Sequence, residues 1–293
     1  MLTVADAIAR FLEALRSRQT PANTLKAYTS DLRQFAAAVP ADLAAVDPPA
    51  IQTFLAGPGT VSAATQRRRH ATLCAFYGWL LRQELITASP MAKVDPADLP
   101  VRLPRPLDPA LVKAILAAIP AAATRERALF TLLYETGMRV GEAIALHVAD
   151  LDLTPDDEKI RVLGKGQRER MVLLTAAPES IRLLRRHLRL AGIHAGALFR
   201  GDARYGGSNL PLDYTTALRA WQRYCRQAGV EATIHQLRHS RASQLVQAGV
   251  PLGTVRKVLG HRNIQSTLIY ADIDPQTVKH DLEEYQRRKG KRR

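Results

Sequence analysis

The residues of this chain that could act on a phosphate group lie in five short segments of its second half. Two of these segments contain an arginine: Arg139 lies in Thr136–Glu142, and Arg238 lies in His235–His239. An arginine presents a planar fork of N–H groups that can bind two phosphate oxygens. The glycine before Met138 predicts a helix end, and Glu142, in the first turn of the next helix, would hold the rotamer of Arg139. An i, i+3 pair of this kind is also common as an ordinary surface ion pair.

A histidine and a lysine add groups that could transfer protons. His235 precedes Arg238 by three residues, so the two side chains share a face if a helix starts here. Together they would place a proton-transfer group beside a positive charge on one phosphate. Lys165 lies between two glycines in a predicted hairpin turn, where the backbone can approach a ligand closely. A lysine at such a position is also an ordinary turn residue.

The last two segments contain a histidine and a tyrosine. Gly260 predicts the end of a helix and would present His261, and Tyr270 follows nine residues later. A phenol can attack phosphorus once it has lost its proton. A tyrosine beside Leu268 and Ile269 is also typical of a hydrophobic core or an interface. Each segment alone is therefore compatible with a purely structural role.

In combination, the five segments resemble the tyrosine recombinase (phage integrase) family. The motifs T-G-x-R-x-x-E, a glycine-flanked hairpin lysine, H-x-L-R-H, L-G-H and a tyrosine nine residues after that histidine all occur in the family's order. The resemblance covers the second half through its motifs and the whole chain through its architecture. No extra amino-terminal arm-binding domain is expected. The chain is thus similar to compact Xer-type recombinases and the simpler integrases of mobile elements.

The resemblance implies a site-specific recombinase, a DNA strand transferase or integrase that forms a 3′-phosphotyrosine at Tyr270. A 5′ hydroxyl from a second duplex would then attack this linkage and reseal the strand. Arg139 and Arg238 would bind the charge that develops on the non-bridging oxygens, and His261 would be a third donor. His235 would be the general base, and Lys165 would protonate the departing 5′ oxygen.

Further residues are expected to orient these groups or to contact DNA. The orienting residues are Glu142, Asp150 and His239. The DNA contacts are Arg67, Arg68, Arg69 and Arg168. The run 67–70 is by itself also typical of a solvated helix face. No cofactor and no metal ion are expected, because the sequence has no Walker loop, no carboxylate pair at metal-ligand spacing and no dinucleotide-binding glycine motif.

The implied partner is double-stranded DNA that carries recombination sites. Strand exchange between two duplexes requires four active sites, which implies a homo-tetramer on DNA or a hetero-tetramer with a paralogous recombinase. We expect a cytoplasmic, nucleoid-associated protein without a membrane partner, because its apolar runs are shorter than the ~18 residues that cross a bilayer. The role would be integration and excision of a mobile element or Xer-type dimer resolution, and the stretch 261–267 resembles mobile-element integrases more.

Two other functions fit part of this pattern. A type IB topoisomerase cleaves DNA with a similar constellation but reseals the same strand. The spacing from L-G-H to Tyr270 and the compact helical first domain favour the recombinase. A non-catalytic DNA-binding regulator would account for the charge and the helices, but it leaves all five motifs coincidental.

The composition agrees with a polyanionic partner. The 293 residues include 42 Lys+Arg and 27 Asp+Glu, for a formal net charge of +15. The excess lies mainly in the second half: residues 1–104 contain 11 basic and 8 acidic residues, and residues 105–293 contain 31 and 19. Such a charge attracts nucleic acid, although it can also serve solubility alone. Cys74 and Cys225 lie far apart, without nearby cysteines or histidine clusters, and predict neither a disulfide framework nor a zinc site.

Hydrophobic spacing predicts the elements that must position these residues. Helices are expected at 4–18, 24–39, 62–83, 110–118, 124–136, 179–190, 214–228, 236–248, 252–259 and 277–288. Two strands, 159–163 and 168–174, flank the turn that contains Lys165. Five prolines between residues 95 and 109 exclude a continuous helix and favour an extended connector.

The expected fold is therefore mainly α, with two domains. A helical core-binding domain that clamps DNA would span residues 1–95, and a proline-rich linker would span 96–109. The catalytic domain would span 110–293, mainly helical with a small antiparallel β-hairpin or sheet and a C-terminal helix followed by a basic tail. The family resemblance favours docking of this C-terminal helix on a neighbouring subunit, and the alternative is a helix packed on its own catalytic domain with a basic end that contacts DNA.

Overall fold

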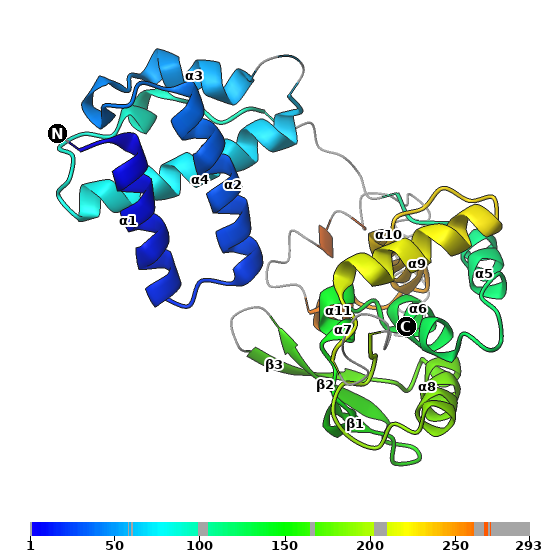
Figure 1. The fold of residues 1–293 in the computed structure, drawn as a ribbon. Coiled ribbons are helices and arrows are strands. Elements are labelled where there is room, and N and C mark those ends of the chain that lie inside the picture. Colours follow the sequence, from blue (N-terminus) through cyan, green and yellow to red (C-terminus); the bar gives the residue numbers. More distant parts are fainter. Residues whose placement is uncertain are drawn as a thin grey trace, which may run out of the picture. The chain divides into compact units, whose positions relative to one another are not determined.

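A computed structural model describes residues 2–57, 59, 61–98, 105–164, 168–201, 210–260, 267, 268 and 270. The chain divides into two compact units, Met1–Val101 and Arg102–Arg293 (Figure 1). In the described part, no helix is long and apolar enough to cross a membrane. The predicted mainly helical fold with a small antiparallel sheet is confirmed.

The first unit is helical. Its elements are α1 (Val4–Ser17), α2 (Ala22–Ala38), η1 (Leu43–Ala45), α3 (Pro48–Ala56), α4 (Ala63–Arg82) and η2 (Pro90–Lys93). Ser62 caps α4, because its hydroxyl accepts a hydrogen bond from the backbone N–H of Thr65 (3.3 Å). The sequence prediction lacks α3. The sequence does contain a signal for α3: the N-cap residue Asp47 is followed by two prolines in the first turn, where a proline loses no helical hydrogen bond.

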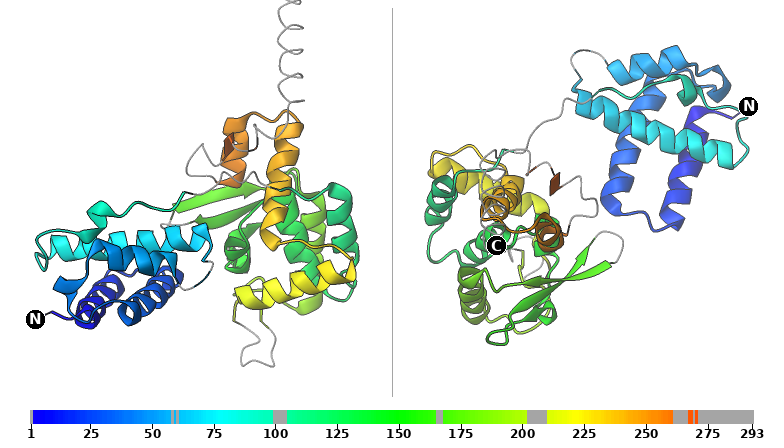
Figure 2. Two further views of the ribbon diagram at one scale, coloured as in Figure 1. Left: turned by 90° about the horizontal axis from the view of Figure 1, so that it is seen from above. Right: turned by 180° about the vertical axis from the view of Figure 1, so that it is seen from behind.

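Aromatic rings dominate the core of this unit. Phe11 packs against Phe76 and Trp79, each at 5.6 Å between ring centroids, and Phe35 packs edge-on against Phe54 at 5.2 Å. Helix α4 crosses α1 and α2 in the right view of Figure 2, and it contacts α1, α2 and α3. The apolar spacing that predicts α1, α2 and α4 is therefore the spacing of their contact faces.

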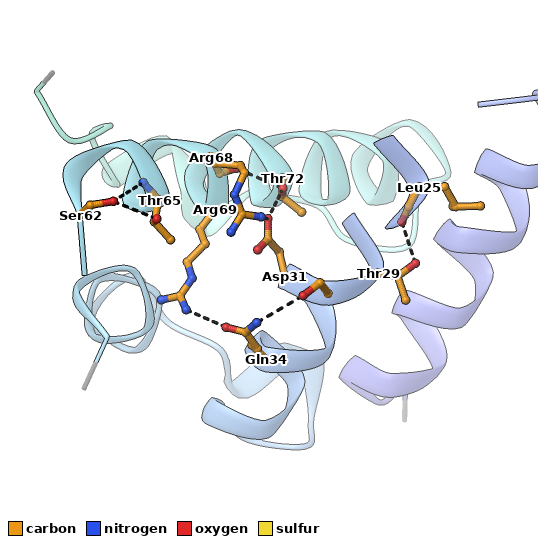
Figure 3. A network of polar contacts seen from close by, with 10 residues as sticks. Leu25, Thr29, Asp31, Gln34, Ser62, Thr65, Arg68, Arg69 and Thr72 are labelled. Carbon is orange, nitrogen blue, oxygen red and sulfur yellow. Dashed lines mark hydrogen bonds and ion pairs between the residues drawn. The ribbon is translucent and has the colours of Figure 1, made fainter. Parts of the chain in front are cut away.

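A polar network joins α4 to α2 and α3 on the side that contains the basic run (Figure 3). Arg68 forms an ion pair with Asp31, whose carboxylate is buried. Arg69 donates to Gln34 Oε1 (2.7 Å) and to the carbonyl of Phe54 (3.2 Å), and its guanidinium lies 4.8 Å from the Phe54 ring. Two arginines of the run thus stabilise the unit itself.

The second unit combines helices with one sheet. Its described elements are α5 (Pro109–Ala117), α6 (Thr124–Thr136), α7 (Val140–Ile144), η3 (Val148–Asp150), β1 (Leu151–Asp152), β2 (Lys159–Gly164), β3 (Arg168–Leu173), α8 (Pro178–Ala191), α9 (Tyr214–Gln227), α10 (Ile234–Gln247) and α11 (Leu252–Leu259). The predicted strand pair is confirmed as β2 and β3. Helix α5 begins at Pro109, so this proline is the first residue of a helix and not part of an extended connector.

The sheet is antiparallel in the order β1-β2-β3 and lies beside the helices, as both views in Figure 2 show. Residues of β3 alternate between its faces: Val172 is buried and Met171 and Leu173 are exposed, and Leu174, directly after the strand, is buried again. Helix α6 is buried on most sides and packs against α8, α10 and α9. This central helix ends at Thr136, with Gly137 as its C-cap two residues before Arg139. The predicted helix at 277–288 lies outside the described residues.

Candidate active site

Arg139 lies at the junction between α6 and α7. Gly137 ends α6 in the left-handed conformation, with φ +67°, and Arg139 is the N-cap of α7. Its Nη1 donates to Glu142 Oε1 (3.0 Å), and its backbone N–H donates to Glu142 Oε2 (3.0 Å). The predicted pair therefore exists, and the guanidinium, with 46% of the side chain exposed, remains accessible to an anion.

Gly137 is required here by both conformation and space. A Cβ on this residue would lie 2.6 Å from Leu259 Cδ2, and the positive φ strains any L side chain. Its carbonyl oxygen also accepts a hydrogen bond from Arg238 Nη1 (2.6 Å). This glycine thus connects the end of α6 with an arginine on α10 that lies 101 residues further along the chain.

Arg238 is a buried cation. Only 3% of the residue is exposed, and its Nη2 has no hydrogen-bond partner among the described residues. Burial, and secondly the charge of Arg139, lower the pKa of Arg238 to about 10, so the side chain remains protonated at neutral pH. A buried guanidinium with an unused N–H group is suited to bind an anion such as phosphate.

Tyr270 lies next to a histidine of α10. Its hydroxyl is 2.6 Å from Nδ1 of His239, and the ring of His239 in turn contacts His235 edge-on, with 4.6 Å between centroids. Only 3% of Tyr270 is exposed, because it packs with Val255, Leu259 and other apolar residues of α10 and α11. The phenol is therefore covered by protein in this structure.

Burial shifts the pKa values of His235, His239 and Tyr270 in the direction that favours the neutral form of each side chain. Burial lowers the pKa of His239 to about 4, with further contributions from His235 and Arg238. Burial also lowers the pKa of His235, and the charges of Arg238 and Arg139 act in the same direction. The pKa of Tyr270 is raised by burial, although the charge of Arg238 opposes this shift. At neutral pH both histidines are able to accept a proton.

The structure brings together five of the residues singled out in the sequence: Arg139, Glu142, His235, Arg238 and His239, with Tyr270 beside the last of these. Lys165 and His261 lie outside the described residues, as does the side chain of Arg168.

Asp150 has different partners from those expected. Its carboxylate accepts hydrogen bonds from the backbone N–H of His147 (2.9 Å) and from Arg161 Nη2 (3.1 Å). These contacts hold η3 against β2, and no contact with Arg139 or the two histidines of α10 is present among the described residues.

Arg170 is a site residue that motif spacing does not identify. It binds both oxygens of Glu142, from Nη1 to Oε1 (3.0 Å) and from Nη2 to Oε2 (2.8 Å). Burial alone would raise the pKa of Glu142, but Arg170 and Arg139 together hold it below its usual range. One sequence signal does exist: Arg170 shares the inward face of β3 with Val172 and Leu174, where a charged residue is unusual.

No group of three or more His, Cys, Asp or Glu side chains that could hold a metal ion occurs in the described part of the chain. The two cysteines are free, Cys74 exposed and Cys225 buried. The described site contains the guanidinium groups of Arg139 and Arg238, the neutral imidazoles of His235 and His239, and the phenol of Tyr270.

Comparison with known proteins gives the class of this fold. The phage integrase family model matches residues 105–277, and the model of the phage integrase N-terminal SAM-like domain matches residues 8–84. The chain is 33% identical to the tyrosine recombinase XerC of Xanthomonas axonopodis pv. citri (strain 306), over 92% of each chain. It is 34% identical to the tyrosine recombinase XerD of Ralstonia nicotianae, over 92% of this chain and 90% of the relative.

Solved structures with the same fold are more distant in sequence. A XerH site-specific recombinase bound to a palindromic difH substrate, in a post-cleavage complex, aligns with a TM-score of 0.73 and 23% identity over 92% of this chain and 82% of the other. The Tn1549 transposon integrase in complex with transposon right end DNA aligns with a TM-score of 0.74 and 18% identity over 97% and 100%.

These matches define a DNA strand-transferring enzyme of the tyrosine recombinase type. The chain belongs to the phage integrase family.

Proposed function

We propose that this recombinase cleaves and rejoins DNA through a covalent 3′-phosphotyrosine at Tyr270. The observation that carries this assignment is Arg238, a buried guanidinium whose Nη2 has no partner among the described residues and whose charge acts on Tyr270. Burial of such a group costs several kcal/mol of desolvation free energy unless an anion completes its hydrogen bonds. The anion in this proposal is the scissile phosphate.

The reaction is a transesterification at phosphorus. The Tyr270 oxygen forms a bond to the phosphorus while the bond to the 5′ oxygen breaks, so the number of phosphoester bonds is unchanged. The linkage energy is retained, and a 5′ hydroxyl can reverse the step on the same or another strand. Arg139 and Arg238 stabilise the charge on the non-bridging oxygens of the transition state, and His261 is the third donor.

Two proton transfers accompany these bond changes. Tyr270 must lose the phenolic proton, and His235 is the proposed acceptor because it lies one turn from Arg238 and is neutral at pH 7. Lys165 supplies a proton to the departing 5′ oxygen. Glu142 orients Arg139, and His239 holds the phenol before DNA is bound.

Tyr270 must leave its covered position before it can attack. With 3% of the residue exposed, the phenol cannot reach a phosphate on a duplex. The raised pKa of this buried phenol also disfavours the phenolate that attacks phosphorus. We infer that DNA binding moves Tyr270 from His239 toward the phosphate held by Arg139 and Arg238.

The partners and the domain roles belong to the same proposal. Residues 1–95 and 110–293, joined by 96–109, would bind double-stranded DNA that carries a recombination site, with Arg67, Arg68 and Arg168 on phosphates. Four protomers, identical or paired with a paralogous recombinase, would act on two sites. Relatives support this view: one solved lambda integrase structure is a tetramer bound to a Holliday junction. The place of action would be the cytoplasm, in association with the nucleoid.

Two biological roles use this chemistry. The curated relatives described above are named XerC and XerD, which supports an Xer-type role. The similarity to the Tn1549 integrase concerns the fold alone. A recombination assay on two sites in one molecule and on two separate molecules distinguishes resolution from integration.

The decisive experiment is covalent trapping on a nicked duplex that carries a site selected for binding from a randomised library. The wild-type chain should form a protein–DNA adduct on a denaturing gel, and Tyr270→Phe should form none while its binding free energy changes by less than about 1 kcal/mol. Tyr214→Phe, at an exposed tyrosine of α9, is the matched control and should cleave normally. An adduct with Tyr270→Phe would overturn the assignment. Recombinant joints between two labelled duplexes separate recombination from resealing of one strand.

A further inference from the structure

Arg170 on β3 links three segments of the candidate active site, and the family motifs assign it no role. In the sequence it lies five residues after Lys165. Its guanidinium pairs with Glu142, and the two side chains are only 18% and 8% exposed. The ion pair is therefore largely removed from water, where its geometry has more influence than in a surface pair.

The carboxylate of Glu142 is shared between two arginines. Oε1 accepts from the terminal nitrogens of Arg139 and Arg170, both at 3.0 Å, and Oε2 accepts from the Arg139 backbone (3.0 Å) and from Arg170 Nη2 (2.8 Å). These four hydrogen bonds use the full acceptor capacity of an ionised carboxylate. The plane of the carboxylate, and with it the position of Arg139, is thus defined by the fork of Arg170.

The charges also indicate that Arg170 supports the position of Arg139. Glu142 contributes one negative charge between two guanidinium groups. Arg170 binds it in a bidentate pair on the buried side, whereas Arg139 makes one side-chain bond and is 46% exposed. Because Arg170 offsets the charge of Glu142, the three side chains together keep a net positive charge, which the exposed Arg139 presents to an anion from outside.

The third contact is with Gly260, at the end of α11. A Cβ on Gly260 would lie 2.6 Å from Arg170 Nε, 2.8 Å from Cζ and 2.9 Å from Cδ. The guanidinium therefore occupies the space that any other residue at position 260 would need. Arg170 therefore packs against the turn that ends α11, and Gly260 directly precedes His261 in the sequence.

We propose that Arg170 is a positioning residue for strand cleavage, which holds Glu142 and Arg139 from β3 and packs beneath the Gly260 turn. The inference rests on the proposed function of the site. It adds a structural requirement: the hairpin, the start of α7 and the end of α11 must be held by one bidentate side chain. A lysine at position 170 keeps the charge but cannot form two parallel hydrogen bonds with a carboxylate.

The test compares Arg170→Lys and Arg170→Gln with the full-length wild type on the nicked duplex described above. We expect the rate constant of adduct formation to fall about 100-fold in both variants, as for a misplacement of about 1 Å at a reacting centre. The dissociation constant for DNA should change less than about threefold, because Arg170 is not a DNA contact in this proposal. Arg182→Lys, in the exposed pair with Glu179 on α8, is the control and should leave both constants unchanged.

Two results would overturn the inference. Wild-type cleavage by Arg170→Lys would mean that charge alone suffices, and a large loss of DNA affinity with an unchanged cleavage rate would make Arg170 a DNA contact. If the wild-type chain forms no adduct at all, it is the proposed function that fails.

A double-mutant cycle then tests the positioning contact without DNA. Gly260→Ala should be less destabilising in the Arg170→Ala background than in the wild type, because the Cβ no longer meets the guanidinium. The strain of the positive φ at residue 260 contributes equally in both backgrounds and cancels from the coupling. Additive effects in urea unfolding would show that the two residues do not interact and would refute the contact.

Discussion

The hydroxyl of Tyr270 and Nδ1 of His239 lie 2.6 Å apart, although 31 residues separate them in the chain. The imidazole of His239 stays neutral at physiological pH because burial lowers its pKa to about 4. With its proton on Nε2, a neutral imidazole accepts the phenolic hydrogen at Nδ1. His239 therefore holds the phenol of Tyr270 in a neutral, covered state, and this state depends on pH.

The first prediction concerns stability in acid. The pKa of His239 is about 4 in the folded chain and about 6.5 in the unfolded chain. Between these values the unfolded chain binds more protons, so the contribution of His239 is complete above pH 6.5 and is lost as the pH falls toward 4. His239→Gln should flatten this part of the pH profile and cost about 1 kcal/mol at pH 7 through the weakened bond to Tyr270.

Unfolding of the second unit can be followed by Trp221 fluorescence in a Trp79→Phe background, because each unit contains one of the two tryptophans. Parallel pH profiles for His239→Gln and its parent would contradict the shifted pKa. The buried His187 acts in both proteins and cancels from the difference, whereas His235 contributes to the shift of His239 and belongs to the same effect.

The second prediction separates the leaving-group acid from the phosphate-binding arginine. Lys165→Ala should cleave an ordinary site slowly, and a substrate with a 5′-bridging sulfur should restore most of the rate, since a thiolate leaves without protonation. Arg139→Ala should stay slow on both substrates, because it lacks a donor to the non-bridging oxygens. Rates of adduct formation measure both effects, and equal rescue of the two variants would rule out the acid role of Lys165.

A third prediction compares two glycines that lie four residues apart. Gly137→Ala should destabilise the second unit by about 1–3 kcal/mol and abolish cleavage, since its Cβ meets Leu259 and its positive φ is strained. Gly141→Ala in α7 meets nothing within 4 Å and should be neutral or stabilising by up to about 1 kcal/mol. Urea unfolding and adduct formation measure both variants, and equal behaviour would contradict the close approach at Gly137.

The fourth prediction divides the basic run of α4 by function. Arg67 is exposed and has no hydrogen bond or ion pair to any described residue, whereas Arg69 is bound to α2 and α3. Arg67→Ala should weaken DNA binding without a loss of stability. The slope of log affinity against log salt concentration should become shallower by about 1, because one fewer counterion is released. Arg69→Ala should instead destabilise the first unit by about 1–2 kcal/mol. Salt titrations of DNA affinity, together with unfolding followed by Trp79, test this division, and a loss of stability in Arg67→Ala would contradict it.

Local features of the sequence predict most of the elements and the family. Apolar spacing locates α1, α4 and α11 within a residue or two, and the glycine-flanked turn locates the β2–β3 hairpin, because helix and strand periods are properties of neighbouring residues. The short α3 and the two-residue β1 escape this reasoning, since so few residues complete too little of a period. The spacing of Arg139, His235, Arg238 and Tyr270 was also sufficient to indicate the family.

Only the tertiary structure decides which side chains meet. Arg170 contacts Glu142 across 28 residues, Arg68 contacts Asp31 across 37, and His239 rather than His235 contacts Tyr270. Hydrophobic spacing specifies which face of an element is buried, but it does not specify the partner that packs against that face. An inward-facing arginine on β3 can be recognised in the sequence as unusual. Its acceptor, and the glycine that makes room for it, are determined by how β3, α7 and α11 pack together.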